Sequence, residues 1–243
     1  MDQSMAFALI AIFLAAIVRG YSGFGFSLLS VTALSLVYPT AKIVPVIFLL
    51  ELAASAHLLP SIWKDIHWRS LVPLSIGCLL ATPFGVWALA SLHANTMQLF
   101  MSAFVLIAVG LMWVGYAMKT MLGPILSTVV GAASGLANGA FGIGGPPVVL
   151  FYFSSPAGNI AGRASLIAFF LVTDTIGLAN LAAYELVTKD TLWLAAAFLP
   201  CLFAGVWLGS RSFKNADQDQ FRKVVLIIMA LLAVIGAAKA LWH

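Results

Sequence analysis

Long apolar runs separated by short polar connections are the main pattern of this chain. The runs cover roughly residues 5–38, 43–60, 70–90, 97–117, 122–153, 160–184, 191–210 and 223–242. Four of the middle and final runs have about 20 residues, the length at which an α-helix crosses roughly 30 Å of hydrocarbon. The first and fifth runs are too long for a single crossing, so we expect each of them to contain an interruption.

Glycines interrupt both of the long runs near the middle. The first run contains the sequence GYSGFG at residues 20–25, and the fifth contains ANGAFGIGGPP at residues 137–147. Glycine allows unusual backbone conformations and close approach of another group, whereas proline suits the first turn of a new helix. The pattern therefore predicts a broken helix in each run, with the breaks at Gly23, Gly25, Gly142, Gly144 and Gly145.

Short matches in the same order along the chain indicate a repeat. Phe24-Gly25 matches Phe141-Gly142, the KDxxW motif at residues 64–68 matches residues 189–193, and GVW at residues 85–87 matches residues 205–207. The offset between the matches drifts, so small insertions separate the two copies. These matches predict two transmembrane repeats, residues 1–120 and 121–243.

The distribution of cations orients the two repeats. If each broken run crosses the membrane once, lysine and arginine divide about evenly between the two sides. If each is a hairpin, one side holds Lys64, Arg69, Lys119, Arg163, Arg211, Lys214, Arg222 and Lys223, and the other only Lys42, Lys189 and Lys239. The positive-inside rule favours the hairpins, and each half then has an odd number of full spans. We expect an all-α polytopic membrane protein of two inverted repeats, each a Gly-interrupted hairpin followed by three transmembrane helices, the architecture of secondary transporters.

The composition excludes a soluble protein. Hydrophobic residues make up 63% of the 243 residues and charged residues 8%, whereas a soluble domain has about 25% charged residues. The net charge of +4 is too small and dispersed to suggest nucleic acid, and it fits loops that face anionic lipid. The two cysteines lie in apolar runs, and no metal-ligand cluster or cofactor motif is present. We expect a multi-pass protein of the bacterial inner (plasma) membrane without a cofactor or metal.

The two breaks together form a candidate anion site. A helix break at membrane depth is tolerated where it is buried in protein or lines a polar cavity, and the helix N-termini that it exposes suit an anion. Ser22 and Asn138 would add side-chain hydrogen bonds. Arg163 is either a bidentate clamp for an oxyanion or an ordinary interfacial anchor. Glycines that only let helices pack closely are the alternative explanation of the breaks.

Further ionisable residues lie within the apolar runs. Arg19 adjoins the first break and could instead extend to the cytoplasmic interface. Glu51 and Asp174 are each followed six residues later by a polar residue, His57 and Asn180. A carboxyl group in the membrane could carry a proton or make a structural hydrogen bond or ion pair. These five residues are candidates for coupling or gating.

Two other classes of protein compete with a transporter. The sequence GYSG resembles the Gly-x-Ser-Gly pattern of intramembrane serine proteases, which would make Ser22 a nucleophile and His57 a base. The matching break in the second half has no serine, so we expect the chain not to be an enzyme. A non-transporting partner subunit is the other class, and it would leave the paired glycine breaks without a purpose.

Four segments carry a resemblance to a known family: GYSGFGFSLLS, IHWRSLVPL, FGIGGPPVVLFYF and GRASLIAFFLVTD. Together they resemble the TauE/SafE family of membrane permeases, which is associated with export of sulfite and organosulfonates, and the resemblance covers essentially the whole chain. The breaks here depart from the three consecutive glycines of many members. The resemblance implies a secondary transporter, running as an exporter, of a small anion such as sulfite or sulfoacetate. H⁺ or Na⁺ is a candidate coupled ion, the lipid bilayer surrounds the protein, and a second copy of the chain is a candidate partner.

Overall fold

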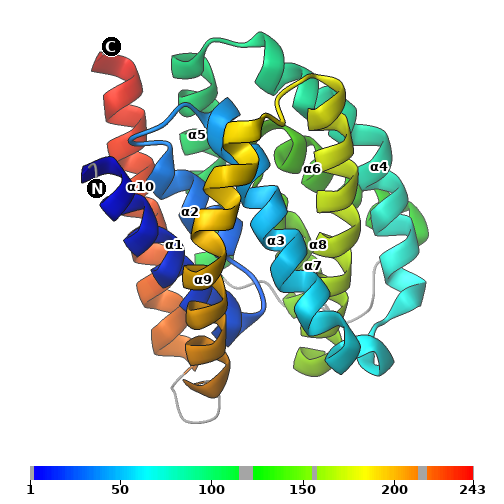
Figure 1. The fold of residues 1–243 in the computed structure, drawn as a ribbon. Coiled ribbons are helices and arrows are strands. Elements are labelled where there is room, and N and C mark those ends of the chain that lie inside the picture. The colour runs from blue at the N-terminus through cyan, green and yellow to red at the C-terminus, as the bar shows by residue number, and fades with distance from the viewer. Residues whose placement is uncertain (1–2, 115–122, 155–157, 213–217, 243) are drawn as a thin grey trace.

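The structure is a computed structural model that describes residues 3–114, 123–154, 158–212 and 218–242. Within these residues the chain forms ten α-helices and one short 3-10 helix (Figure 1). In chain order they are α1 (Gln3–Ser22), α2 (Phe26–Leu34), α3 (Thr40–Ile62), η1 (Trp63–Asp65), α4 (Trp68–Ser91), α5 (Ala94–Val114), α6 (Pro124–Phe141), α7 (Gly145–Ser154), α8 (Gly158–Ala183), α9 (Lys189–Ser212) and α10 (Gln218–Trp242). The predicted all-α class is confirmed.

Seven of the helices are long and apolar enough to cross a membrane, namely α1, α3, α4, α5, α6, α8 and α9. In α10 the described apolar stretch is shorter and covers Leu226–Leu241. α2 has nine residues and α7 has ten. At about 1.5 Å per residue such helices reach only about 15 Å, roughly half of the hydrocarbon thickness. The protein is therefore a multi-pass membrane protein with two short helices that do not cross.

The two short helices form hairpins with the helices that precede them. α1 ends at Ser22 and α2 begins at Phe26, and α2 leads back to the end of the molecule where α1 starts (Figure 1). Gly23 and Gly25, with φ of 80° and 90°, make the reversal. In the second half Gly142, with φ of 68°, ends α6 before α7. L-residues rarely adopt such positive φ values, which explains why glycine occupies these positions.

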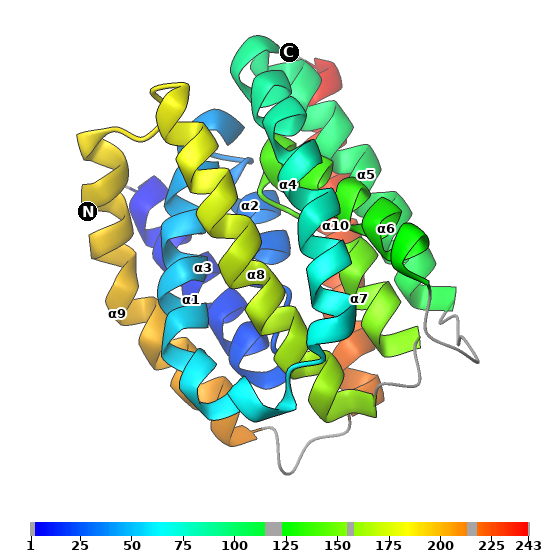
Figure 2. The ribbon, with the colours of Figure 1, turned by 90° about the vertical axis from the view of Figure 1, so that its right-hand side faces the viewer.

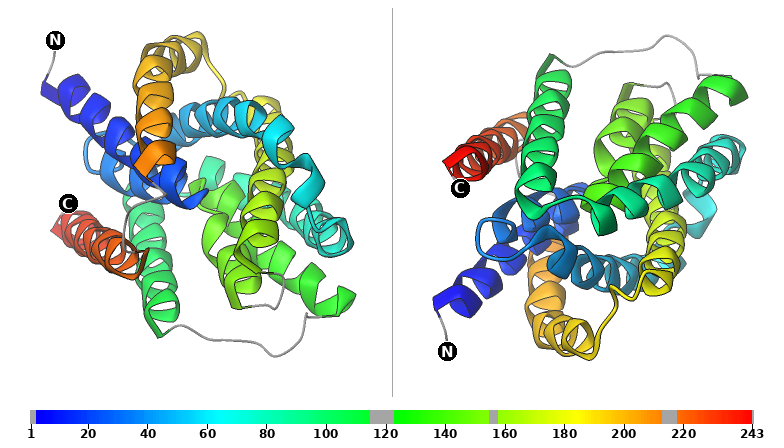
Figure 3. Two further views of the ribbon diagram at one scale, coloured as in Figure 1. Left: turned by 90° about the horizontal axis from the view of Figure 1, so that it is seen from below. Right: turned by 90° about the horizontal axis from the view of Figure 1, so that it is seen from above.

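Helix contacts come in equivalent pairs along the two halves. α4 packs on α6 and α9 packs on α1, while α2 contacts α3 and α10 just as α7 contacts α8 and α5. Figure 2 shows α3 and α8 between α9 and α4, and both views of Figure 3 show α10 alongside α5. These pairings match the order of the predicted repeat, in which α1 to α5 correspond to α6 to α10. The boundary predicted between residues 120 and 121 lies outside the described residues, as do Lys119 and Lys214.

The two GVW segments have the same surroundings in both halves. Gly85 of α4 packs against the backbone of α6, and Gly205 of α9 packs against the backbone of α1. The valine that follows is buried in each case, and the tryptophans, Trp87 and Trp207, are exposed on the outer surface. Equivalent sequence segments thus perform equivalent packing. This supports the repeat, and the inverted orientation of the two halves in a membrane stays a prediction.

The described cations separate as the hairpin arrangement requires. Figure 1 shows the connection between α3 and α4, with Lys64 and Arg69, at the end of the molecule where α9 also ends. The first turns of α3 and α9 and the last turn of α10 lie at the opposite end, and they carry Lys42, Lys189 and Lys239. The two KDxxW motifs therefore lie at opposite ends.

Close packing of α4 on α6 depends on glycines without side chains. A Cβ atom on Gly131 would overlap the carbonyl oxygen of Leu74. We expect Gly131→Ala to lower the free energy of unfolding by about 1–3 kcal/mol, because two packed backbones must separate. Gly110 of α5 is the matched control, since a Cβ there meets nothing within 4 Å. Thermal unfolding in detergent should show a lower midpoint for Gly131→Ala and no loss for Gly110→Ala; equal midpoints would contradict this packing.

Candidate functional site

The first break places the start of α2 against a buried carboxylate. Gly25 precedes α2 and has no side chain with which to cap the helix. The backbone N–H of Ser27, in the first turn of α2, instead donates to Glu51 Oε1 at 3.2 Å. Glu51 lies in α3 and is only 2% exposed. The carboxylate thus occupies the position that a helix N-terminus offers to an anion.

Arg19 is paired with the same carboxylate. Its Nη2 lies 3.0 Å from Glu51 Oε2 and donates to Ser55 Oγ at 2.7 Å. The ring of Phe170 from α8 lies 5.1 Å from the guanidinium carbon. Arg19 is completely buried, so the sequence alternative in which it extends to the membrane interface is wrong. An arginine is stable at such a place only when its charge is compensated.

The second break is held by side chains of α6. Asn138 Oδ1 accepts a hydrogen bond from the backbone N–H of Gly144 at 3.2 Å, and the Ser134 hydroxyl donates to the carbonyl oxygen of the same glycine. A Cβ on Gly144 would lie 2.8 Å from Asn138 Cβ. Gly145 has no such restriction, because a Cβ there would only meet the Phe170 ring at ordinary contact distance. Asn138 therefore satisfies the backbone of the second break, while its predicted contact with an anion stays a prediction.

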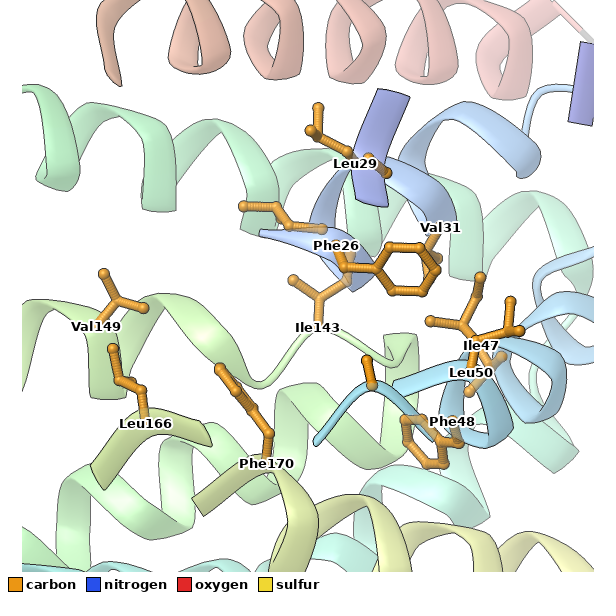
Figure 4. Close-up of a cluster of buried hydrophobic side chains, with 14 of the residues drawn as sticks. Phe26, Leu29, Val31, Ile47, Phe48, Leu50, Ile143, Val149, Leu166 and Phe170 are labelled. Atoms are coloured by element: carbon orange, nitrogen blue, oxygen red, sulfur yellow. The ribbon is translucent and has the colours of Figure 1, made fainter. Parts of the chain in front are cut away.

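Asp174 connects the second break to the buried ion pair. Asn138 Nδ2 donates to Asp174 Oδ1 at 3.0 Å. Asp174 is 2% exposed and lies within electrostatic range of both Glu51 and Arg19. Figure 4 shows the apolar surroundings: Phe26 of α2, Phe48 of α3 and Phe170 of α8 belong to one buried cluster together with Ile143 of the second break. The polar groups of both breaks are thus enclosed by hydrophobic side chains.

Arg163 lies directly against the first break. A Cβ on Gly23 would lie 2.7 Å from Arg163 Cγ and 3.0 Å from its Nε. The two arginines are also close enough to interact electrostatically, Arg163 from α8 with Arg19 from α1. Arg163 is half-buried, whereas Arg19 is fully buried. The structure therefore places the Arg163 side chain against the first break, and the Arg19 guanidinium on the carboxylate that accepts from the first turn of α2.

The start of α8, which carries Arg163, is hydrogen-bonded to the segment that precedes α4. The Ser165 hydroxyl accepts from the backbone N–H of His67 at 2.9 Å. The hydroxyls of Ser70 and Tyr152 lie 3.0 Å apart in hydrogen-bond contact, which ties α4 to α7. Ser165 lies two residues after Arg163, so the first of these contacts holds this part of α8 against the start of α4.

Comparison with known proteins identifies the family. The family described as sulfite exporter TauE/SafE matches residues 8–235 of the chain. The chain belongs to the TauE/SafE family. A probable sulfite/organosulfonate exporter TauE from Cupriavidus necator is 29% identical over 195 residues, which cover 78% of this chain and 75% of the relative. No solved structure matches the chain.

Membership in the TauE/SafE family places the chain among membrane transporters and not among enzymes. The hydrolase alternative combined Ser22 with His57. The His57 ring makes an edge contact with Phe203 of α9, with 5.8 Å between ring centroids, and the side chain of Ser22 lies outside the described part of the structure. No observation places the two together.

Two other predicted residues have their contacts outside the group formed by Arg19, Glu51, Asn138, Asp174 and Arg163 in the described structure. His57 is exposed and contacts α9. Asn180 donates to the carbonyl oxygen of Ile176 on its own helix at 2.8 Å. A pocket of about 200 Å³ lies elsewhere, between the ends of α2, α3, α5 and α10, with Gln98 and Lys239 in its lining. It contains none of the predicted site residues.

Several polar or aromatic contacts at the site were missed by the sequence interpretation. They are Ser27, Ser55, Ser134 and Phe170. Three of them lie four residues from a predicted residue on the same helix, which places them on the same helical face. Ser55 follows Glu51, Ser134 precedes Asn138, and Phe170 precedes Asp174 by this spacing. The period of the helix was therefore a usable signal.

Proposed function

We propose that the chain is a secondary transporter of a small sulfur oxyanion or organosulfonate, such as sulfite or sulfoacetate, and that it operates as an exporter. The anion binds near the middle of the membrane between the two glycine breaks. Arg163, the backbone of the first break and Asn138 at the second break contribute to its binding. The relative from Cupriavidus necator, a probable sulfite/organosulfonate exporter, supports this substrate class.

The observation that carries the proposal is the pair of arginines at one glycine break. Arg163 lies against Gly23 of the first break, and Arg19 pairs with the carboxylate at the start of α2. Guanidinium groups bind planar or pyramidal oxyanions through paired N–H donors. Burial strengthens the electrostatic attraction for an anion because water screens it less. A purely structural purpose would not require a second arginine beside a fully buried ion pair.

The charge of the cluster fits the binding of one anion. Two guanidinium groups, Arg19 and Arg163, lie near two carboxyl groups, Glu51 and Asp174. The net charge is therefore zero when both carboxyl groups are ionised, and it becomes more positive by one unit for each proton taken up. Either protonation of a carboxyl group or movement of a carboxylate away from the arginines lowers the negative charge beside them, so that an anion can bind.

Transport in proteoliposomes tests this function. We expect purified protein to exchange labelled sulfite and sulfoacetate across the membrane at rates well above those of protein-free liposomes. The same anions should raise the thermal unfolding temperature in detergent, because a ligand that binds only the folded state stabilises it. Dimethyl sulfone, an uncharged molecule with a similar sulfur centre, is the matched control and should produce no shift. Neither flux nor a shift with any sulfur oxyanion would overturn the proposal.

A further inference from the structure

Glu51 occupies the place of an anion in the described structure. Its Oε1 accepts the Ser27 N–H at the start of α2, and its Oε2 pairs with Arg19. A helix N-terminus and a guanidinium group are the two features that bind oxyanions elsewhere in proteins. Both are here directed at a carboxylate of the protein itself. The structure thus corresponds to a carrier in which an internal group occupies an anion-binding position.

Arg19 retains capacity for a further acceptor. Its Nη2 is used by Ser55 and Glu51, while Nε and Nη1 have no hydrogen-bond partner among the described residues. A buried guanidinium group has five N–H donors, and unsatisfied ones are costly. An oxyanion that enters between Arg19 and Arg163 would supply acceptors for them.

We propose that Glu51 is an internal substitute for the transported anion, and that binding of the anion drives protonation of Glu51 and couples one proton to each anion. This inference rests on the proposed function of the chain. When the anion pairs with the Arg19 guanidinium, the buried Glu51 carboxylate loses its counter-ion. A proton from solution then neutralises it, and the anion and the proton cross together. On release of the anion the proton leaves and Glu51 pairs with Arg19 again.

The groups around Glu51 define what else could titrate. Arg19 approaches it from α1, Asp174 and Arg163 lie on α8, and Cys78 on α4 lies within electrostatic range of Asp174. α2 contributes no titratable side chain. Asp174 is thus the alternative proton carrier, and it differs from Glu51 because its hydrogen-bond partner is the neutral Asn138.

The coupling has a defined sign. The free protein holds Glu51 ionised against Arg19, and the complex holds it protonated, so binding takes up a proton. Affinity for the anion should therefore fall as pH rises, by up to about tenfold per pH unit for one coupled proton. A divalent anion that crosses with one proton carries a net charge of −1. The interior-negative membrane potential would therefore still drive its export.

Isethionate is the best probe because its sulfonate group stays ionised at every pH used. In proteoliposomes that contain the wild-type protein, we expect a pH gradient alone to drive isethionate accumulation. A potassium diffusion potential alone should not drive it, because an anion and a proton move as a neutral pair. Glu51→Gln should remove the response to pH and create a response to potential, since the anion then moves without its proton. Glu185→Gln changes an exposed carboxyl group outside the cluster and should behave as wild type.

The outcomes separate the coupling from the function itself. A Glu51→Gln variant that keeps the wild-type response to pH would overturn the coupling, as would loss of that response in Asp174→Asn alone. Absence of flux for every sulfur anion in the wild type would instead overturn the proposed function. A measurement on the unmodified protein avoids any folding defect of the variants. Addition of isethionate to wild-type protein in weak buffer should take up one proton per anion bound, and binding without proton uptake would also overturn the inference.

Discussion

Replacement of Arg19 by methionine is expected to lower the free energy of unfolding by about 3–5 kcal/mol, because it leaves the Glu51 carboxylate buried without its counter-ion. Arginine and methionine side chains have similar volumes, so the loss of stability measures removal of the charge and not creation of a cavity. Glu51→Leu alone should lower the free energy of unfolding by a similar amount, because it leaves the Arg19 guanidinium buried without its counter-ion. Both residues are at most 2% exposed, which limits compensation by water.

The double variant tests whether these losses belong to one ion pair. Arg19→Met combined with Glu51→Leu should recover most of the stability, because a buried ion pair is often replaceable by hydrophobic residues. A remaining loss of about 1 kcal/mol is expected because the Ser27 N–H loses its acceptor. Arg69→Met replaces an exposed arginine and serves as the control, with a change within about 0.5 kcal/mol. Additive losses in a double-mutant cycle measured by reversible unfolding in detergent would show that the two residues are not coupled.

Much of the architecture could be predicted from the sequence, because residue type determines where a helix breaks and run length determines whether it can cross the membrane. Glycine is required where φ is positive, so the breaks at Gly23, Gly25 and Gly142 could be predicted from composition within an apolar run. The number of hairpins and long helices followed from run lengths and the hydrocarbon thickness. Pro146 and Pro147 marked the first turn of α7, as the structure has it.

The pairing of charges could not be predicted in the same way. Arg19 and Glu51 are separated by 32 positions in the sequence and meet only because the first hairpin folds back against α3. Periodicity indicates which residues share a helical face, but it does not indicate which face of another helix they meet. For this reason the sequence alone does not distinguish an interfacial anchor from a site residue at Arg19. The same limit applies to His57, a sequence candidate for coupling or gating whose ring contacts Phe203 of α9 in the structure.

Arg163→Ala is expected to reduce transport of sulfite by about 10- to 100-fold, because charge-assisted hydrogen bonds contribute about 1.5–3 kcal/mol each and every 1.4 kcal/mol is tenfold in affinity. The side chain lies against Gly23 at the first break, the place where we propose that the anion binds. The loss should appear as weaker binding in thermal-shift titrations as well as slower flux. Expression and the unfolding temperature without ligand should change little, since Arg163 is only half-buried.

Arg163→Lys separates the clamp from the interfacial anchor. Lysine keeps the positive charge that the positive-inside rule requires, but its single ammonium group cannot form the paired N–H contacts of a guanidinium group. A clamp therefore predicts that Arg163→Lys remains impaired, whereas an anchor predicts complete recovery. Arg69→Ala removes an exposed cation from the same end of the molecule and should retain normal flux. Full activity in both Arg163 variants would remove this residue from the site and leave Arg19 as the arginine that the anion must meet.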